Sequence, residues 1–146
     1  MKQFSTAKFE EEIARKFLEE NLIRNSAGKT YQSWKALVAA FASKNREKLK
    51  SLFQGKVRIK GGKKVEKVDW IIAVMPSTVL KIVAQTIGGK IDVYTNLALL
   101  IHSYQYNGPD SQGILSPYIN DESAKADIVK LLDIINEILK EEGVKE

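Results

Sequence analysis

Apolar side chains recur three and four residues apart in several long segments of this chain, and this spacing constrains the fold more than any other feature. An α-helix has 3.6 residues per turn, so residues at these intervals share one face. In the first such segment, Phe9, Ile13 and Phe17 recur at every fourth position and are expected to face the core. No stretch of strand length alternates apolar and polar residues with a period of two. The sequence therefore predicts an all-α protein, a mostly up-and-down bundle of four to five helices.

Capping residues and helix breakers set the expected ends of the helices. Ser5 or Thr6 is the expected N-cap of the first helix, and Asn120 is that of the last. Pro76 has no backbone N–H, so a break is expected after Met75, inside the third segment. The predicted helical segments are Thr6–Leu22, Ser26–Phe53, Val65–Ile87, Asp92–Tyr106 and Asp121–Glu142.

The 146 residues are expected to form one domain, residues 1–146, with a basic connection at about 54–64. Gly55, Gly61 and Gly62 bracket this connection. It is predicted to be either a mobile loop or a short hairpin.

Positive charge is concentrated around this connection. The segment from Lys44 to Lys67 holds ten basic and two acidic residues, a net charge of +8, whereas the whole chain carries +5. One interpretation is a solvated, lysine-rich loop. The other is a patch that binds phosphate backbones or another acidic partner. The residues of the predicted nucleic-acid patch are Lys56, Arg58, Lys60, Lys63 and Lys64.

Composition narrows the chemistry that the chain can perform. Cysteine is absent and histidine occurs once, so no metal site and no cofactor are predicted. The N-terminus has no apolar signal-peptide core, and no segment reaches the roughly 20 apolar residues that span a bilayer. We therefore expect a cytoplasmic protein without membrane contact. Abundant lysine and glutamate favour a thermophilic source.

His102 is the candidate for acid–base chemistry. Leu99 and Ala98 lie three and four residues before it, which places the ring on or beside the apolar stripe of its helix. It is therefore either a packed, hydrogen-bonded helix residue or a general base that needs an orienting partner.

Polar and aromatic residues near His102 form a candidate pocket for a small molecule. Trp34 is either part of it or a core residue, and the turn that contains Asn107 and Asp110 supplies either polar anchors or a helix exit. The candidate binding residues are Lys29, Trp34, Lys35, Tyr106, Asn107 and Asp110. The Gly-Lys-Thr at 28–30 is not a phosphate-binding loop, because Ile23 occupies the position of that motif's first glycine.

Three stretches, "SAGKTYQSWKALVAAF", "DWIIAVMPST" and "LALLIHSYQYNGPD", together resemble the archaeal PaREP family of small helical proteins. The resemblance rests on a Gly-Lys-x-x-Gln-x-Trp-Lys-Ala pattern that begins at Gly28 and on Leu-x-x-His-x-Tyr around His102. That family is similar to the HEPN superfamily of helical bundles. The resemblance implies a homodimer. It also implies a ribonuclease, or a partner of a nucleotidyltransferase-like protein, in a toxin–antitoxin or defence setting.

The nuclease motif of HEPN proteins has an arginine followed by a polar residue and, several positions later, a histidine. His102 and Asn96 match this frame, but Thr95 stands at the arginine position. Without the cation that would hold the phosphate, we expect a non-catalytic helical module that binds a protein or nucleic-acid partner, RNA among them. The alternatives are a metal-independent ribonuclease that uses His102, and a binder of a small molecule or nucleotide.

Overall fold

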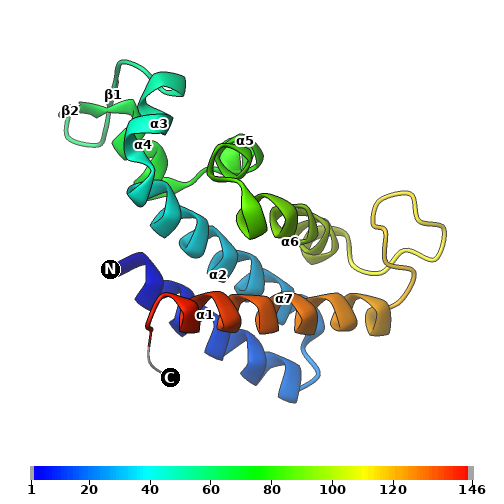
Figure 1. The fold of residues 1–146 in the computed structure, drawn as a ribbon. Coiled ribbons are helices and arrows are strands. Elements are labelled where there is room, and N and C mark those ends of the chain that lie inside the picture. Colours follow the sequence, from blue (N-terminus) through cyan, green and yellow to red (C-terminus); the bar gives the residue numbers. More distant parts are fainter. Residues whose placement is uncertain (1, 145–146) are drawn as a thin grey trace.

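The computed structural model describes residues 2–144, and these contain seven α-helices and one two-stranded hairpin (Figure 1). The all-α class is confirmed, whereas the expected number of four to five helices is wrong. The elements are α1 (Lys2–Glu19), α2 (Ile23–Lys44), α3 (Arg46–Leu52), β1 (Lys56–Arg58), β2 (Lys64–Glu66), α4 (Lys67–Val74), α5 (Ser77–Ile87), α6 (Gly89–Asn107) and α7 (Asp121–Glu141).

The helix α2 forms the centre of the molecule and packs against each of the other six helices. Its alanine-rich sequence favours helix, and its side chains at Trp34, Leu37 and Val38 are fully buried. On the far side of the core, α7 buries the predicted apolar stripe, including Ile128, Leu131 and Ile135. The apolar residues of all these helices form one continuous cluster.

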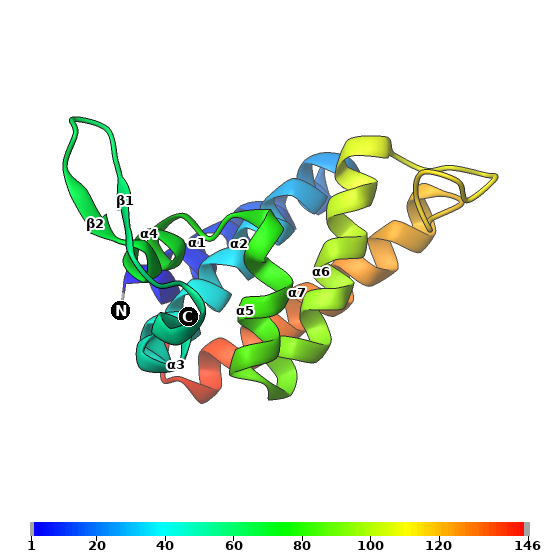
Figure 2. The ribbon, with the colours of Figure 1, turned by 90° about the horizontal axis from the view of Figure 1, so that it is seen from above.

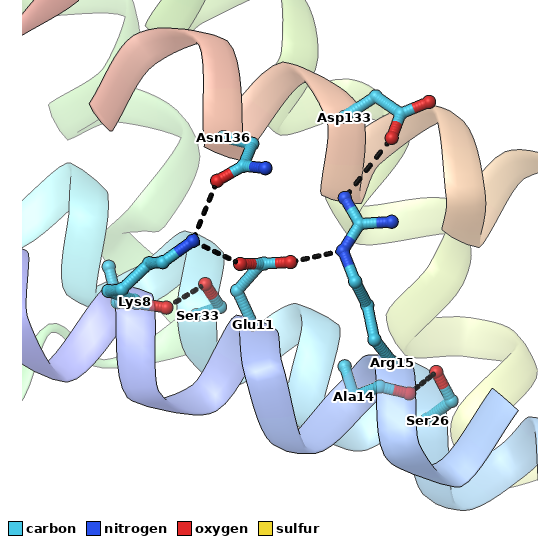
Figure 3. A network of polar contacts seen from close by, with 9 residues as sticks. Lys8, Glu11, Ala14, Arg15, Ser26, Ser33, Asp133 and Asn136 are labelled. Carbon is cyan, nitrogen blue, oxygen red and sulfur yellow. Dashed lines mark hydrogen bonds and ion pairs between the residues drawn. The ribbon is translucent and has the colours of Figure 1, made fainter. Parts of the chain in front are cut away.

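The helix α1 packs closely along α2 through small residues. Ala7 and Ala14 are fully buried, and their carbonyl oxygens accept hydrogen bonds from Ser33 Oγ at 2.6 Å and from Ser26 Oγ at 2.8 Å (Figure 3). The expected face of this helix is wrong, because Phe9 is 61% exposed. Small side chains bring two helix backbones together, and aromatic spacing alone does not reveal such an interface.

A polar network around the buried carboxylate of Glu11 joins α1 to α7 (Figure 3). Glu11 is 1% exposed and lies between two cations of its own helix, Lys8 at 3.1 Å and Arg15 on the other oxygen. Lys8 also donates to Asn136 at 2.9 Å, and Arg15 also donates to Asp133 at 3.1 Å. Each cation therefore has one partner on each of the two helices.

Two of the predicted segments are divided into two helices each. The break after Met75 is confirmed: Met75 has a left-handed backbone with φ 43°, Pro76 follows, and α4 and α5 meet at 102°. The second break, at Asn45, was not expected; it separates α2 from α3, and the Asn45 amide donates to the Phe41 carbonyl at 2.8 Å.

The ends of the chain's first and last helices differ in how well they were predicted. The expected N-cap at Ser5 or Thr6 is wrong, because α1 already begins at Lys2 and the Thr6 hydroxyl donates to the Lys2 carbonyl inside the helix. The expected N-cap of α7 is confirmed, since the Asn120 side chain accepts a hydrogen bond from the Ser123 N–H at 2.8 Å.

The basic connection is the short hairpin β1–β2, so this alternative is confirmed and the loop alternative is not. The strands are antiparallel, with Arg58 opposite Lys64 and Lys56 opposite Glu66. Gly61 and Gly62 form the turn with positive φ angles, which glycine adopts without strain.

Among residues 2–144, no single helix has both the length and the apolar character to cross a membrane. Helices α4 and α5 together have the required length and apolar character, but the two helix axes are bent by 102° relative to each other.

Candidate nucleic-acid interface

The hairpin carries five exposed cations and projects from the helical body (Figure 2). Among the residues that the structure describes, none of the five forms an ion pair, and Arg58 donates only to the Gly62 carbonyl of the turn, at 3.0 Å. These cations are the predicted patch residues Lys56, Arg58, Lys60, Lys63 and Lys64. The structure thus gathers the whole predicted patch on one exposed element.

Basic side chains on the helical body are in a different situation. Lys90 lies 3.0 Å from Glu137 and 2.9 Å from Glu141, and Arg46 lies 2.7 Å from Asp69. An exposed ion pair of this kind contributes about 0–1 kcal/mol, so it matters here mainly because it neutralises charge locally. Within residues 2–144, the acidic residue of the hairpin is Glu66, at its base.

Strand register places like charges opposite one another. Arg58 pairs with Lys64 across the ladder, and directly opposed like charges destabilise a two-stranded sheet. An isolated hairpin is already marginally stable. A positive surface maintained against this repulsion favours a role in contact with an anion.

His102 belongs to a second cluster, at the C-terminal part of α6. Its ring stacks on Tyr31 of α2, with 3.9 Å between ring centroids and 16° between planes. The ring of Tyr106 meets it edge to face at 5.0 Å. His102 Nδ1 lies 3.3 Å from the Gln105 side-chain oxygen, within hydrogen-bond distance.

The electrostatics of this cluster favour a neutral imidazole. Burial lowers the pKa of His102 below its ordinary value, and the positive charge of Lys35 lowers it further, against the opposite effect of the Gln105 hydrogen bond. Burial also lowers the pKa of Lys35, whose ammonium lies 5.8 Å from the centre of the Tyr31 ring. His102 is therefore packed and hydrogen-bonded, which is the first of the two interpretations of this residue.

Two shallow grooves follow the exposed side of α2. The first has a volume of about 400 Å³ and lies between α1, α2 and the end of α4, with Lys2, Gln32 and Lys35 among its lining residues. The second has a volume of about 600 Å³, and its lining includes Arg24, Lys29 and again Gln32. Lys35 therefore connects the first groove to the His102 cluster.

The six predicted binding residues are not gathered in one pocket. Lys35 and Tyr106 lie in the His102 cluster, and Lys29 lines the second groove, where it pairs with Glu10 at 3.3 Å. Trp34 is fully buried, and its indole N–H donates to Thr95 at 2.8 Å, which is the core interpretation of this residue.

The remaining two binding candidates, Asn107 and Asp110, stabilise the loop after α6. Asn107 donates to the Leu115 carbonyl at 3.0 Å. The Asp110 carboxylate accepts from three backbone N–H groups, those of Gln112, Ile114 and Leu115, and these hydrogen bonds lower the pKa of Asp110. Both side chains are thus occupied by the loop's own backbone.

Sequence reasoning missed Tyr31 and Gln105 as members of the His102 cluster. Gln105 follows His102 by three residues, so helical spacing is a signal that could have identified it. Tyr31 lies far away in the sequence, on α2, and no local spacing relates it to His102. Its hydroxyl donates to Ser77 Oγ at 2.7 Å, at the start of α5.

The position expected for the nuclease arginine faces the core. Thr95 is 1% exposed; its hydroxyl accepts from Trp34 and donates to the Ile91 carbonyl at 2.7 Å. A side chain at this position points away from the surface around His102. Asn96, next to it, is exposed and accepts a hydrogen bond from Lys81.

The family model of the archaeal PaREP1/PaREP8 family matches residues 2–129, which is most of the chain and includes both clusters. The chain belongs to this family. The expected family resemblance is therefore confirmed, and the wider HEPN relationship stays a prediction. Neither the curated proteins nor the solved structures contain a match to the chain.

Proposed function

We propose that this PaREP1/PaREP8 family protein is a non-catalytic helical module that binds the sugar–phosphate backbone of nucleic acid through the β1–β2 hairpin. The observation that carries the proposal is the set of five exposed hairpin cations, none of which forms an ion pair with another residue in 2–144. Phosphate contacts from lysine and arginine supply most of the affinity of non-specific nucleic-acid binding. The buried position of Thr95, where a nuclease arginine would stand, supports binding without cleavage.

Salt dependence measures this binding directly. Five phosphate contacts to a single strand give a slope of about −3.5 in a plot of log K against log salt, from about −0.7 per contact. Raising the salt from about 50 to about 200 mM then weakens binding about a hundredfold. The assay is fluorescence anisotropy with labelled RNA and DNA, and absence of salt-sensitive binding to either would reject the proposal.

A matched pair of variants locates the contacts. Replacing Lys60 and Lys63 by glutamine removes two hairpin charges and reduces the slope by about 1.4. The control replaces Lys16 and Lys130 by glutamine; both are exposed residues on helices away from the hairpin, and the net charge changes equally. Equal effects of the two variants would show that only total charge matters and would contradict a hairpin site.

A second candidate function is metal-independent RNA cleavage by His102. It is supported by the burial of His102, which lowers the pKa of its imidazole and favours the neutral form that can accept a proton, and by the nearby positive charge of Lys35. The test is incubation of labelled RNA with the wild type and with His102→Ala. Equal cleavage by both proteins, or none by either, would end this alternative.

The partner predictions extend the proposal. A homodimer, a nucleotidyltransferase-like protein partner and a toxin–antitoxin or defence setting all rest on the HEPN resemblance. If that setting is right, the gene for this chain lies beside a nucleotidyltransferase or defence gene. Co-expression of the two proteins followed by size-exclusion chromatography tests the complex directly.

A further inference from the structure

We infer that the nucleic acid is single-stranded and that one of its bases stacks on Tyr106, with the strand running from the hairpin along the first groove of α2. This inference rests on the proposed function, since it assumes that the hairpin binds a phosphate backbone. It adds which form of nucleic acid binds and which side chain receives a base.

Tyr106 presents an aromatic ring at the surface on a rigid support. The side chain is 68% exposed, and its ring meets His102, which in turn stacks on the buried ring of Tyr31. Three rings therefore lead from the core to the surface. A further flat ring, such as a nucleobase, extends this series, because every base has an aromatic face.

The backbone beneath this ring is also held in place. Arg24 of α2 donates to the Tyr106 carbonyl at 2.7 Å and to the Gln105 carbonyl at 3.0 and 3.1 Å. These hydrogen bonds satisfy carbonyl groups at the C-terminal end of α6, where a cation is also favourable. A platform fixed before binding loses little conformational entropy when a base stacks on it.

The first groove connects this platform to the hairpin. Lys35 lines the groove and lies over Tyr31, while Ala73 and Val74 of α4 and the following Met75 form another part of its wall. The hairpin leads directly into the other end of α4, and eight helical residues are about 12 Å long. In Figures 1 and 2 the C-terminal end of α6 lies near the start of α2, and the hairpin lies near the other end of α2.

The groove has the character of a path for a phosphate backbone. Its lining includes two lysines, Lys2 and Lys35, and the polar residues Gln3, Thr6 and Gln32, with Glu10 as the acidic member. Glu10 already pairs with a cation of the second groove. Two lysines in a groove that also has an apolar wall, combined with an exposed aromatic ring, suit a single strand. The bases of a duplex are stacked on one another, so their faces are covered.

The experiment compares four probes of one length, about 15 nucleotides, at low salt. These are single-stranded RNA, single-stranded DNA, the duplex of the same sequence, and a single strand with abasic positions throughout. Each is titrated with the wild type, with Tyr106→Ala and with Tyr106→Phe, which keeps the ring. Because Tyr106 is largely exposed, the alanine variant is expected to keep the wild-type thermal unfolding midpoint, which serves as the folding control.

We expect both single strands to bind more tightly than the duplex, and Tyr106→Ala to weaken them by about tenfold without changing the salt slope. Tyr106→Phe should retain wild-type affinity, and the abasic strand should not distinguish the variants. RNA bound more tightly than DNA indicates a contact to the 2′-hydroxyl, and equal affinities indicate stacking without one; both support the inference.

The two proposals fail in different ways. Salt-sensitive binding that prefers the duplex, or that is unchanged in Tyr106→Ala, overturns the single-strand inference and leaves the hairpin proposal standing. Absence of salt-sensitive binding to all four probes overturns both.

Discussion

The buried carboxylate of Glu11 allows a stability prediction whose size follows from its neighbours. Glu11→Ala removes the negative charge between Lys8 and Arg15 and leaves both cations without their shared partner. Removing one member of a buried ion pair costs about 3–5 kcal/mol. For Glu11→Ala we expect the free energy of unfolding to fall by about 2–3 kcal/mol, at or below the lower end of this range. The reason is that Lys8 keeps its hydrogen bond to Asn136, while Arg15 keeps its ion pair with Asp133 and is about one-third exposed.

Urea unfolding followed by circular dichroism measures this loss, with an unchanged m-value as the sign that only stability has altered. The corresponding fall in Tm is about 5–10 °C. The control is Glu12→Ala, the adjacent exposed glutamate of the same helix, for which we expect a change within about 0.5 kcal/mol. If Glu11→Ala were as mild as the control, the carboxylate would not stabilise the two cations around it, and the reasoning would be refuted.

Three further predictions concern α6. Thr95→Val leaves the Trp34 indole N–H buried without an acceptor, so the free energy of unfolding measured in urea should fall by about 1–3 kcal/mol. Since a typical hydrogen bond contributes about 1 kcal/mol, a change below about 0.5 kcal/mol would contradict the importance of this one. Burial lowers the pKa of His102 in the folded chain. When the pH is below the ordinary pKa of histidine, the unfolded chain therefore binds more protons than the folded one. The free energy of unfolding should therefore fall as the pH drops from about 7 to about 5.5, and His102→Gln should reduce this fall; an NMR titration that gives His102 a pKa at or above its ordinary value would oppose this. The homodimer is tested by sedimentation velocity, with Leu100→Lys, a charge on an exposed apolar position of α6, expected to favour the monomer; a wild type that is monomeric at all concentrations would reject the dimer.

The parts of the fold that were predictable depend on local sequence. The break after Met75 follows from the chemistry of proline, and the cap of α7 follows from Asn120. The start of α1 was missed because Phe4, whose ring meets Phe41 at 5.6 Å, extends the buried face of the helix toward the N-terminus. Asn45 ends α2 without a glycine or proline, so tertiary packing decided that boundary.

In the candidate site, too, the features that depend on local sequence were predictable and those that depend on tertiary packing were not. The charge of the hairpin is local, and five basic residues within nine positions, 56–64, are visible in any reading of the sequence. The stack of His102 on Tyr31 exists only after α2 and α6 pack together, so helical periodicity does not reveal it. Trp34 is among the predicted binding residues, but it is fully buried in the core. The polar residues next to it in the sequence do not reveal this burial.

The hairpin is attached to the helices without contributing to their interior. No residue from 54 to 67 is buried, and the hydrogen bond from the Lys67 N–H to the Gly55 carbonyl, 2.9 Å long, closes its base. Extra residues inserted at the Gly61–Gly62 turn would lengthen this arm at a small entropic cost, about 0.6 kcal/mol for each doubling of a flexible loop. The length of this arm is therefore decoupled from the stability of the helices that carry it.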